Sequence, residues 1–184
     1  MLVLMLSGIL LMPVAAPQKT AWCYSDETNP YFQFSTYTAY EDVYGNETKP
    51  VVIQNCQPVE FWMLCRHGTR YPTDAIYLQM KSLTDLRERI IENHEIYHRG
   101  ELCSKDLSNL KRWNLQTVSP LSGMLTPNGH EGLHNLAKRY KARFPNLLNQ
   151  AYNSDQFEFR MTDTQRTAAS AVAFADGLFG PGNS

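Results

Sequence analysis

The stretch VEFWMLCRHGTRYPT, residues 59–73, joins an apolar run to a cluster of basic side chains. Residues 59–65 are almost continuously apolar and rich in β-formers, which is typical of a buried strand covered on both faces in a parallel sheet. His67 follows directly, between Arg66 and Arg70. Open α/β sheets place their ligand sites at the carboxyl ends of their strands. The stretch therefore predicts a sheet and a binding site at its edge.

Helical patterns alternate with strand-like runs along the rest of the chain. A stripe of Leu and Ile side chains follows Thr73, which suits the N-cap of a helix. We also expect a short helix near residues 107–115, a helix from Thr126-Pro127 to about Phe144-Pro145, a second strand over 157–162 and a helix over 164–178. This alternation predicts an α/β fold with an at least partly parallel sheet.

Composition narrows the class of protein. The chain has 184 residues, is 43% hydrophobic and carries a formal net charge of −1. These values fit one globular domain that is long enough to bury a core. Its 17 Lys and Arg residues are dispersed along the sequence, so no nucleic-acid partner is expected.

The N-terminus predicts export. Residues 1–16 are almost wholly apolar and end in small residues, as a signal peptide does, although a buried N-terminal helix is the alternative. No later run is long enough for a membrane helix, so no membrane contact is expected after cleavage. Residues 17–50 form an aromatic and polar segment that we expect to lie over the domain formed by residues 51–184. A carbohydrate-binding aromatic strip is the other interpretation of that segment.

The cysteines and one sequon agree with export. Four cysteines allow three disulfide pairings, and the sequence does not rank them. Asn46 begins the glycosylation sequon Asn-Glu-Thr. We therefore expect the protein to be secreted or to reside in the endoplasmic reticulum lumen.

Two stretches, HEIYH at 94–98 and HEGLH at 130–134, match the His-Glu-x-x-His zinc motif. A zinc helix holds both histidines well inside a stable helix. The first motif precedes Arg99-Gly100, a helix-stop signal, and the second follows Pro127-Asn128-Gly129 and so occupies a first turn. We expect two polar helix faces and no metal site.

The cluster around His67 suits phosphate chemistry better. An imidazole between two guanidinium groups can attack phosphorus while Arg66 and Arg70 hold the phosphate oxygens. Gly68 removes a side chain beside the imidazole. Pro72 suits an early position of the next helix, whose N-terminus would add backbone donors. The sequence thus predicts His67 as a nucleophile toward a phosphorylated small molecule.

These motifs resemble a known family. RHGTRYPT resembles the Arg-His-Gly-x-Arg-x-Pro signature of the histidine acid phosphatases, branch 2 of the histidine phosphatases. LTPNGHEGLHNLAKRY and FRMTDTQRTAASAVAFADGL are similar to two further segments of that family. By this resemblance Arg166 is a third phosphate-binding arginine, and Arg160 is a weaker candidate for the same role.

Within the family, the chain most resembles members that act on inositol polyphosphates. The resemblance implies an α/β core, a sheet flanked by helices with a helical cap, and stepwise removal of phosphates from inositol hexakisphosphate and lower polyphosphates. It implies no metal and no cofactor. A broad-specificity acid phosphatase and a catalytically incomplete phosphate-binding protein are the alternatives, and the oligomeric state is left open.

The resemblance also implies a proton donor in a His-Ala-Glu or His-Asp motif, and neither occurs in this sequence. We expect the chain to be the N-terminal part of a larger enzyme or a truncated product with an incomplete sheet. The general acid is then expected beyond Ser184. Asp163 could substitute for it, but a capping or ion-pair role suits that residue better.

Overall fold

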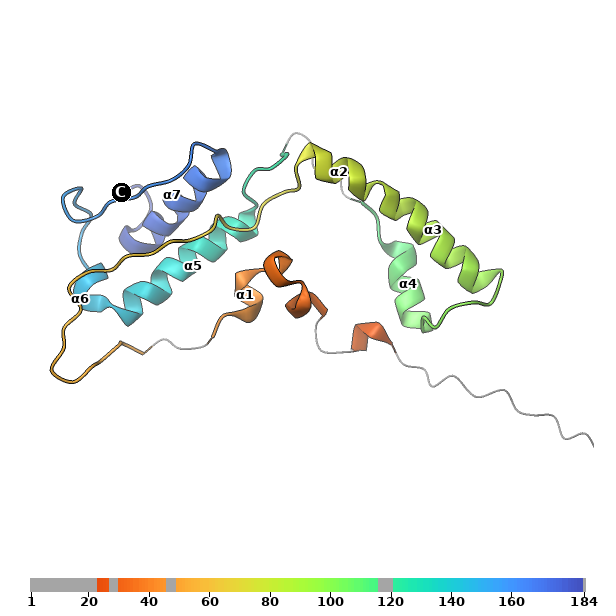
Figure 1. The fold of residues 1–184 in the computed structure, drawn as a ribbon, viewed down its shortest axis with the longest axis horizontal. Helices are drawn as coiled ribbons and strands as arrows, with labels where there is room; N and C mark the ends of the chain where they lie inside the picture. Colours follow the sequence, from red (N-terminus) through yellow and green to blue (C-terminus); the bar gives the residue numbers. More distant parts are fainter. Residues whose placement is uncertain (1–22, 27–29, 46–48, 116–120, 184) are drawn as a thin grey trace, which may run out of the picture.

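The computed structural model describes residues 23–26, 30–45, 49–115 and 121–183. The predicted signal peptide and the sequon at Asn46 lie outside these residues. The described part is helical (Figure 1). Its α-helices are α1 (Tyr40–Val43), α2 (Asp74–Met80), α3 (Ser82–Glu95), α4 (Ser104–Arg112), α5 (Pro127–Arg143), α6 (Pro145–Leu148) and α7 (Gln165–Phe179). Three short 3₁₀ helices precede α1: Tyr24–Asp26, Pro30–Gln33 and Ser35–Tyr37.

The predicted α/β fold is wrong for this part of the chain, because neither expected strand forms. A strand needs a neighbouring backbone to satisfy its N–H and C=O groups. Residues 59–65 and 157–162 are extended but unpaired, and the bridges in the described residues are two isolated ones, Ile53 with Cys56 and Arg70 with Leu125. No sheet therefore lies between helices here.

The apolar run 59–65 is covered on one face rather than two. Phe61 and Met63 pack against the hydrophobic core, whereas Trp62 and Leu64 are 77% and 84% exposed. The run was expected to be a doubly covered strand because its sequence is apolar at almost every position. The alternation in the structure follows the two-residue period of an extended chain, in which successive side chains point to opposite sides.

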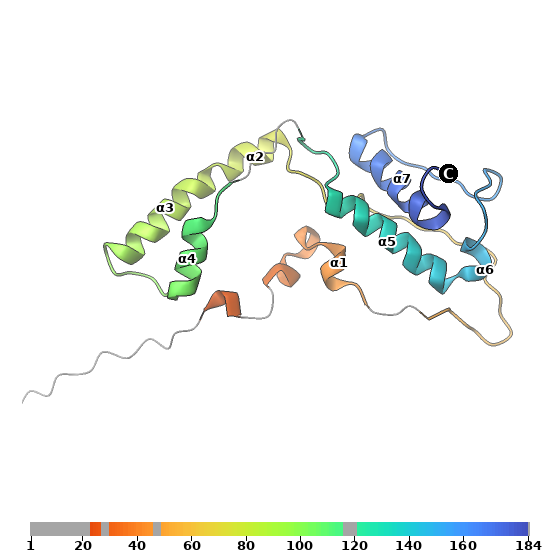
Figure 2. The same cartoon turned by 180° about the vertical axis from the view of Figure 1, so that it is seen from behind.

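The core lies between α5 and α7, which run side by side in both views (Figures 1 and 2). Helix α5 begins as predicted, with the Thr126 side chain accepting a hydrogen bond from the Gly129 amide at 3.0 Å and Pro127 in the first turn. Its buried residues include Leu133, Leu136 and Ala137, at the spacing of one helix face. They meet a matching face of α7 that contains Ala173, Phe174 and Leu178.

Small residues let the two helices approach closely. Ala137 and Ala173 are both fully buried. A Cβ atom on Gly177 of α7 would lie 2.3 Å from the carbonyl oxygen of His134 and 2.7 Å from the Cβ of Ala137. These contacts are too short for any side chain, so the α5–α7 distance depends on glycine at position 177.

Aromatic rings on the two extended segments close the sides of this core. The Phe61 ring lies 5.0 Å from Tyr140 and 5.5 Å from Phe144, between ring centroids. The Phe157 ring meets Phe179 edge to face at 4.8 Å. Ring pairs at such distances add to the stability that their buried area provides. The unpaired segments are thus held by side chains rather than by a backbone ladder.

Helices α2, α3 and α4 form a second group that points away from the α5–α7 pair (Figure 1). The helix predicted after Thr73 is confirmed, although it is interrupted at Lys81 between α2 and α3. Thr73 occupies the N-cap position without a side-chain hydrogen bond. The short helix expected near residues 107–115 forms slightly earlier, as α4. None of the described helices is long and apolar enough to cross a membrane.

We predict that Gly177→Ala destabilises the protein by about 1–3 kcal/mol, the usual cost of overpacking a core. The new methyl group would push α7 away from the α5 backbone. Gly45→Ala is the matched control, since a Cβ atom there meets nothing within 4 Å. Denaturant unfolding measures both variants. Equal midpoints for Gly177→Ala and the unchanged protein would contradict this account of the packing.

Candidate active site

The loop that carries the basic cluster is paired with the segment leading into α5. The Tyr71 amide donates to the Met124 carbonyl at 2.9 Å, and the Gly123 amide donates to the Pro72 carbonyl at 3.0 Å. The Thr69 carbonyl accepts from both the amide and the hydroxyl of Thr126, each at 2.9 Å. Thr126 therefore caps α5 and holds the loop at the same time.

Glycines let the loop cross the start of α5 at backbone contact. A Cβ atom on Gly68 would lie 2.3 Å from the Gly129 carbonyl oxygen, and one on Gly129 would lie 2.1 Å from the Thr69 carbonyl oxygen. On its other side, the Gly68 amide donates to the Ser170 hydroxyl of α7 at 3.0 Å. The residue after His67 is thus enclosed by both core helices. Gly68 was expected to remove a side chain beside the imidazole, and in the structure it also allows the loop to cross α5 closely.

The His67 ring is half-buried and oriented by its own neighbour. Its Nδ1 atom lies 2.8 Å from the Gly68 carbonyl oxygen. A carbonyl oxygen only accepts hydrogen bonds, so Nδ1 carries the proton in this contact. In the neutral imidazole the lone pair then remains on Nε2. This tautomer is the one that a nucleophilic Nε2 requires.

A cavity of about 610 Å³ lies at this loop. Arg66, His67 and Arg70 line it together, so the structure brings the central cluster of the prediction into one site. Its other walls come from residues 36–41, from Ile76 and Met80 of α2, and from the face of α5 between Gly129 and Tyr140. Cavities of this size are typical of small-molecule sites.

Both arginines of the cluster contact backbone carbonyls near the cavity. An Nη1 atom of Arg66 lies 3.5 Å from the Thr36 carbonyl oxygen, and one of Arg70 lies 2.8 Å from the Tyr71 carbonyl oxygen. A guanidinium group has five N–H donors in a planar fork. These contacts therefore orient the side chains and leave donors for an anion in the cavity.

Arg166 lies beside the site but does not line the cavity. It belongs to the first turn of α7, and its Nη1 atom is 3.9 Å from the position that a Cβ of Gly123 would occupy. The Gly123 amide is hydrogen-bonded to the carbonyl of Pro72, and Pro72 does line the cavity. The Nε atom of Arg166 is buried and has no hydrogen-bond partner among the described residues. The Arg166 guanidinium thus lies next to the basic loop, and its Nε–H can still donate a hydrogen bond.

The weaker candidates lie elsewhere. The side chain of Arg160 is 84% exposed and pairs with Glu158 at 2.7 Å. Asp163 is exposed, and Thr164 rather than Asp163 occupies the N-cap position of α7. Neither Arg160 nor Asp163 lines the cavity.

The N-terminal segment contributes a wall that was not predicted in the sequence analysis. Glu41 lines the cavity, and its carboxylate lies 3.9 Å from Nη2 of Arg139 on α5. The guanidinium of Arg139 also lies over the ring of Tyr44, 4.1 Å from its centroid. The aromatic, polar composition of residues 17–50 indicated packing over the domain, but no local pattern singled out Glu41.

The first of the two histidine pairs does not lie on one helix. Helix α3 ends at Glu95, and His98 beyond it has a positive φ of 52°, so His94 and His98 do not share a helix face. The His94 ring instead lies 3.0 Å from the Leu102 carbonyl oxygen. His130 is exposed in the first turn of α5, as expected, and His134 is half-buried.

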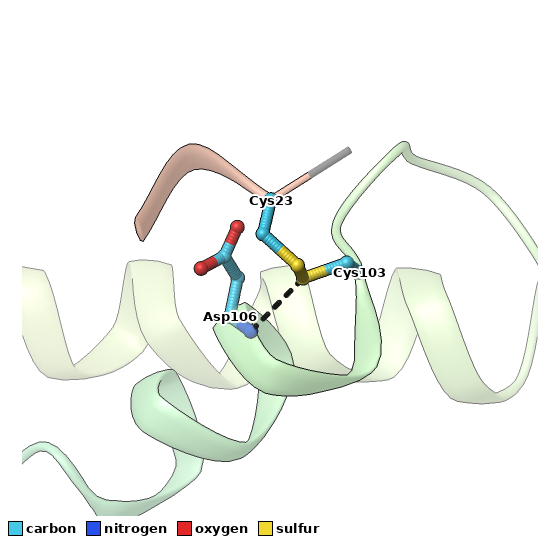
Figure 3. Close-up of side chains that lie close together, drawn as sticks. All are labelled: Cys23, Cys103 and Asp106. Carbon is cyan, nitrogen blue, oxygen red and sulfur yellow. Dashed lines mark hydrogen bonds between the residues drawn. A yellow bond between two sulfur atoms is a disulfide. The ribbon is translucent and has the colours of Figure 1, made fainter. Parts of the chain in front are cut away.

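Within the described ranges, the group of potential metal ligands that come together is Cys23, Cys103 and Asp106 (Figure 3). The two sulfur atoms are joined in a disulfide, so they are not available as thiolate ligands. Of the three pairings that the sequence left open, this structure has Cys23–Cys103, with Cys56 and Cys65 free and exposed. Although Cys65 is exposed as a residue, neighbouring protein atoms partly desolvate its thiol and raise the pKa of that thiol.

Comparison with known proteins identifies the family. Residues 61–184 match the model of the histidine phosphatase superfamily, branch 2, so the chain belongs to this family and the resemblance seen in its motifs is confirmed. Over 184 residues it is 36% identical to multiple inositol polyphosphate phosphatase 1 of Drosophila melanogaster, covering 95% of the chain and 39% of that relative. The human protein of the same name is 30% identical over 161 residues, which are 82% of the chain and 32% of the relative. The chain thus spans less than half the length of each relative. No solved structure matches it significantly.

We predict that Asp106 ties the N-terminal segment to α4 in a pH-dependent way. Its carboxylate accepts from the amides of Tyr24 and Ser25 at 2.6 and 3.1 Å, beside the disulfide. The hydrogen bond from the Ser25 side chain, with these amide bonds, lowers the pKa of Asp106 below its ordinary value. A lowered folded-state pKa gives stability that is complete above the unfolded pKa and is lost as pH falls through the folded pKa.

The unchanged protein should therefore unfold at a higher temperature than Asp106→Asn at neutral pH, and the two should converge as pH falls below about 4, near the unfolded pKa of Asp. Thermal unfolding monitored across this pH range measures the difference. Asp155→Asn, in the exposed turn before residue 157, is the control and should show no such convergence. A difference that does not change with pH would contradict the assignment.

Proposed function

We propose that the protein is a phosphomonoester hydrolase that removes phosphates from inositol polyphosphates through a phosphohistidine at His67. One observation carries the assignment. The Gly68 carbonyl accepts a hydrogen bond from Nδ1–H of His67, so the lone pair lies on Nε2, and His67 lines a cavity together with two arginines. A lone pair and two cations at one cavity suit attack on a phosphate group.

The first step is a displacement at phosphorus. Nε2 of His67 forms a bond to phosphorus as the bond from phosphorus to the inositol oxygen breaks, and that oxygen takes a proton. In the second step water attacks phosphorus and gives a proton to the group that protonated the leaving oxygen. The N–P bond breaks, and inorganic phosphate leaves with His67 restored. Two such steps replace one difficult displacement.

The arginines supply the charge that this chemistry needs. Arg66 and Arg70 line the cavity and would hold the equatorial phosphate oxygens through paired N–H donors. Arg166 adds a third guanidinium from the start of α7, beside the loop. Because these groups offset the charge that develops on the oxygens, no metal or other cofactor is required. A place for Arg160 in this set stays a prediction.

The leaving oxygen needs a proton donor, and the described residues contain one carboxylate that lines the cavity, Glu41. That carboxylate lies 3.9 Å from Nη2 of Arg139, so it already has an ion-pair partner. We therefore assign the general acid to none of the described residues.

Inositol polyphosphates are the proposed substrate class because both reported relatives carry that substrate in their names and match most of the chain. The proposed location is the secretory pathway, either secreted or retained in the endoplasmic reticulum lumen. The Cys23–Cys103 disulfide supports it, since disulfides persist in oxidising compartments.

We predict that rapid quenching in alkali, where the N–P bond of phosphohistidine survives, traps label on the protein after mixing with ³²P-labelled inositol hexakisphosphate. His67→Ala should abolish the trapped label, because Nε2 of His67 is the atom that binds phosphorus. His130→Ala, at an exposed histidine of α5, is the control and should keep it. Label that survives in His67→Ala would overturn the mechanism.

Substrate class is tested separately. We expect phosphate release from inositol hexakisphosphate to be more efficient, as kcat/KM, than release from a simple aryl phosphate. Arg66, Arg70 and Arg166, the arginine clamp, recognise phosphate itself, so preference for the polyphosphate must come from other cavity walls. Equal efficiency on both substrates would instead support a broad-specificity acid phosphatase.

A further inference from the structure

We propose that Ser170 of α7 is a positioning residue that holds His67 in its nucleophilic tautomer by way of Gly68. Its role in turnover rests on the proposed function of His67. Ser170 is 6% exposed and is the buried polar residue in the part of the chain that the structure describes. Its neighbours in the sequence of α7 are mostly Ala, Val and Phe. Burial of a hydroxyl costs folding free energy unless the group is hydrogen-bonded. The hydrogen-bond partner of Ser170 therefore indicates what the hydroxyl does.

The partner is the residue next to the nucleophile. The Ser170 hydroxyl oxygen accepts from the Gly68 amide at 3.0 Å, and the Gly68 carbonyl accepts from His67 Nδ1 at 2.8 Å. Ser170 and the imidazole are therefore joined through one residue, which offers its N–H to the first and its C=O to the second. The two hydrogen bonds point the Gly68 carbonyl at Nδ1.

Gly68 needs such an anchor more than another residue would. Glycine has the freest backbone, and it has no side chain with which to hold itself. On one side Gly68 is in backbone contact with α5, where a Cβ atom would lie 2.3 Å from the Gly129 carbonyl oxygen. That contact restricts its position but provides no hydrogen bond. The Ser170 hydroxyl supplies the directional contact from the opposite helix.

Loss of the hydroxyl would change the protonation of the ring. Without the Ser170 hydroxyl, the backbone of Gly68 can rotate. Its carbonyl then turns away from Nδ1, and the ring loses its hydrogen-bond acceptor. The hydrogen bond at one ring nitrogen determines which nitrogen carries the proton. In part of the molecules Nε2 would then carry it, and a protonated Nε2 has no lone pair to attack phosphorus.

Helix α7 also links this support to the phosphate clamp. Arg166 and Ser170 are four residues apart, so they lie on the same face of α7, one turn from each other. One rigid helix thus carries both an arginine beside the basic loop and the anchor of the nucleophile. The distance between Arg166 and the hydroxyl that anchors Gly68 is thereby set by a single element.

The test compares Ser170→Ala with Ser170→Thr, which keeps a hydroxyl. Ser108→Ala, at an exposed serine of α4, is the matched control. The first readout is the ¹⁵N NMR spectrum of the His67 ring at a pH where it is neutral. We expect the Nδ1–H tautomer to dominate in the unchanged protein and in Ser108→Ala, to fall in Ser170→Ala, and to recover in Ser170→Thr.

The second readout is the rate of phosphohistidine formation in the quench experiment. Partners that orient a metal-binding histidine typically contribute about 10- to 100-fold to activity, and by analogy we expect phosphohistidine formation to slow by that order in Ser170→Ala. KM should change little, because the arginine clamp is untouched. A purely structural role would lower the amount of folded protein without changing the tautomer of the folded fraction.

The outcomes separate this inference from the proposed function. A His67 tautomer in Ser170→Ala that equals that of the unchanged protein overturns the positioning role, even if phosphohistidine forms. A changed tautomer with no phosphohistidine in the unchanged protein supports the positioning role and rejects the phosphatase mechanism. If Ser170→Ala does not fold, Ser170→Cys replaces it, because sulfur is a weak acceptor of similar shape. The same tautomer comparison then decides.

Discussion

The backbone contact at Gly68 is the constraint on which the rest of this structure depends. A glycine here lets the basic loop touch the first turn of α5, and its amide reaches the Ser170 hydroxyl on α7. The two helices can offer both contacts only because Gly177 lets them approach each other. The packing of the core therefore determines the geometry of the site. A change in the α5–α7 distance would move the Gly68 carbonyl, and with it the imidazole that this carbonyl orients.

Much of the helical structure and the centre of the site could be predicted from the sequence, because both depend on local signals. Thr126 followed by Pro127 is a strong helix start, and the apolar spacing that follows places Leu133, Leu136 and Ala137 on one face. The Arg-His-Gly pattern also predicted that His67 lines a binding site, because the residues that suit His67 to phosphate chemistry are its neighbours in the sequence. These local signals do not show which distant residue each element contacts. For that reason the contact between Ser170 and Gly68 could not be predicted.

The strands could not be predicted correctly, for a related reason. The apolar composition of residues 59–65 records which side chains avoid water, but a strand also requires a second backbone at hydrogen-bonding distance. In the described structure the helices cover one side of the run, and Trp62 and Leu64 remain exposed on the other. The wall around Glu41 was missed likewise. Its contact with Arg139 joins residues that are far apart in the chain, and the sequence around either residue does not indicate the other.

The disulfide between Cys23 and Cys103 bears on the order in which the cavity is assembled. It spans 80 residues and fastens the beginning of the segment that later forms the wall at residues 36–41. The opposite wall, on α5, is synthesised well after Cys103. Contacts between such distant segments form only after the entropy of closing the intervening chain has been lost. Once the two thiols are joined, the disulfide keeps the wall segment near the place where it packs, which lowers the entropy that is lost when the wall meets α5.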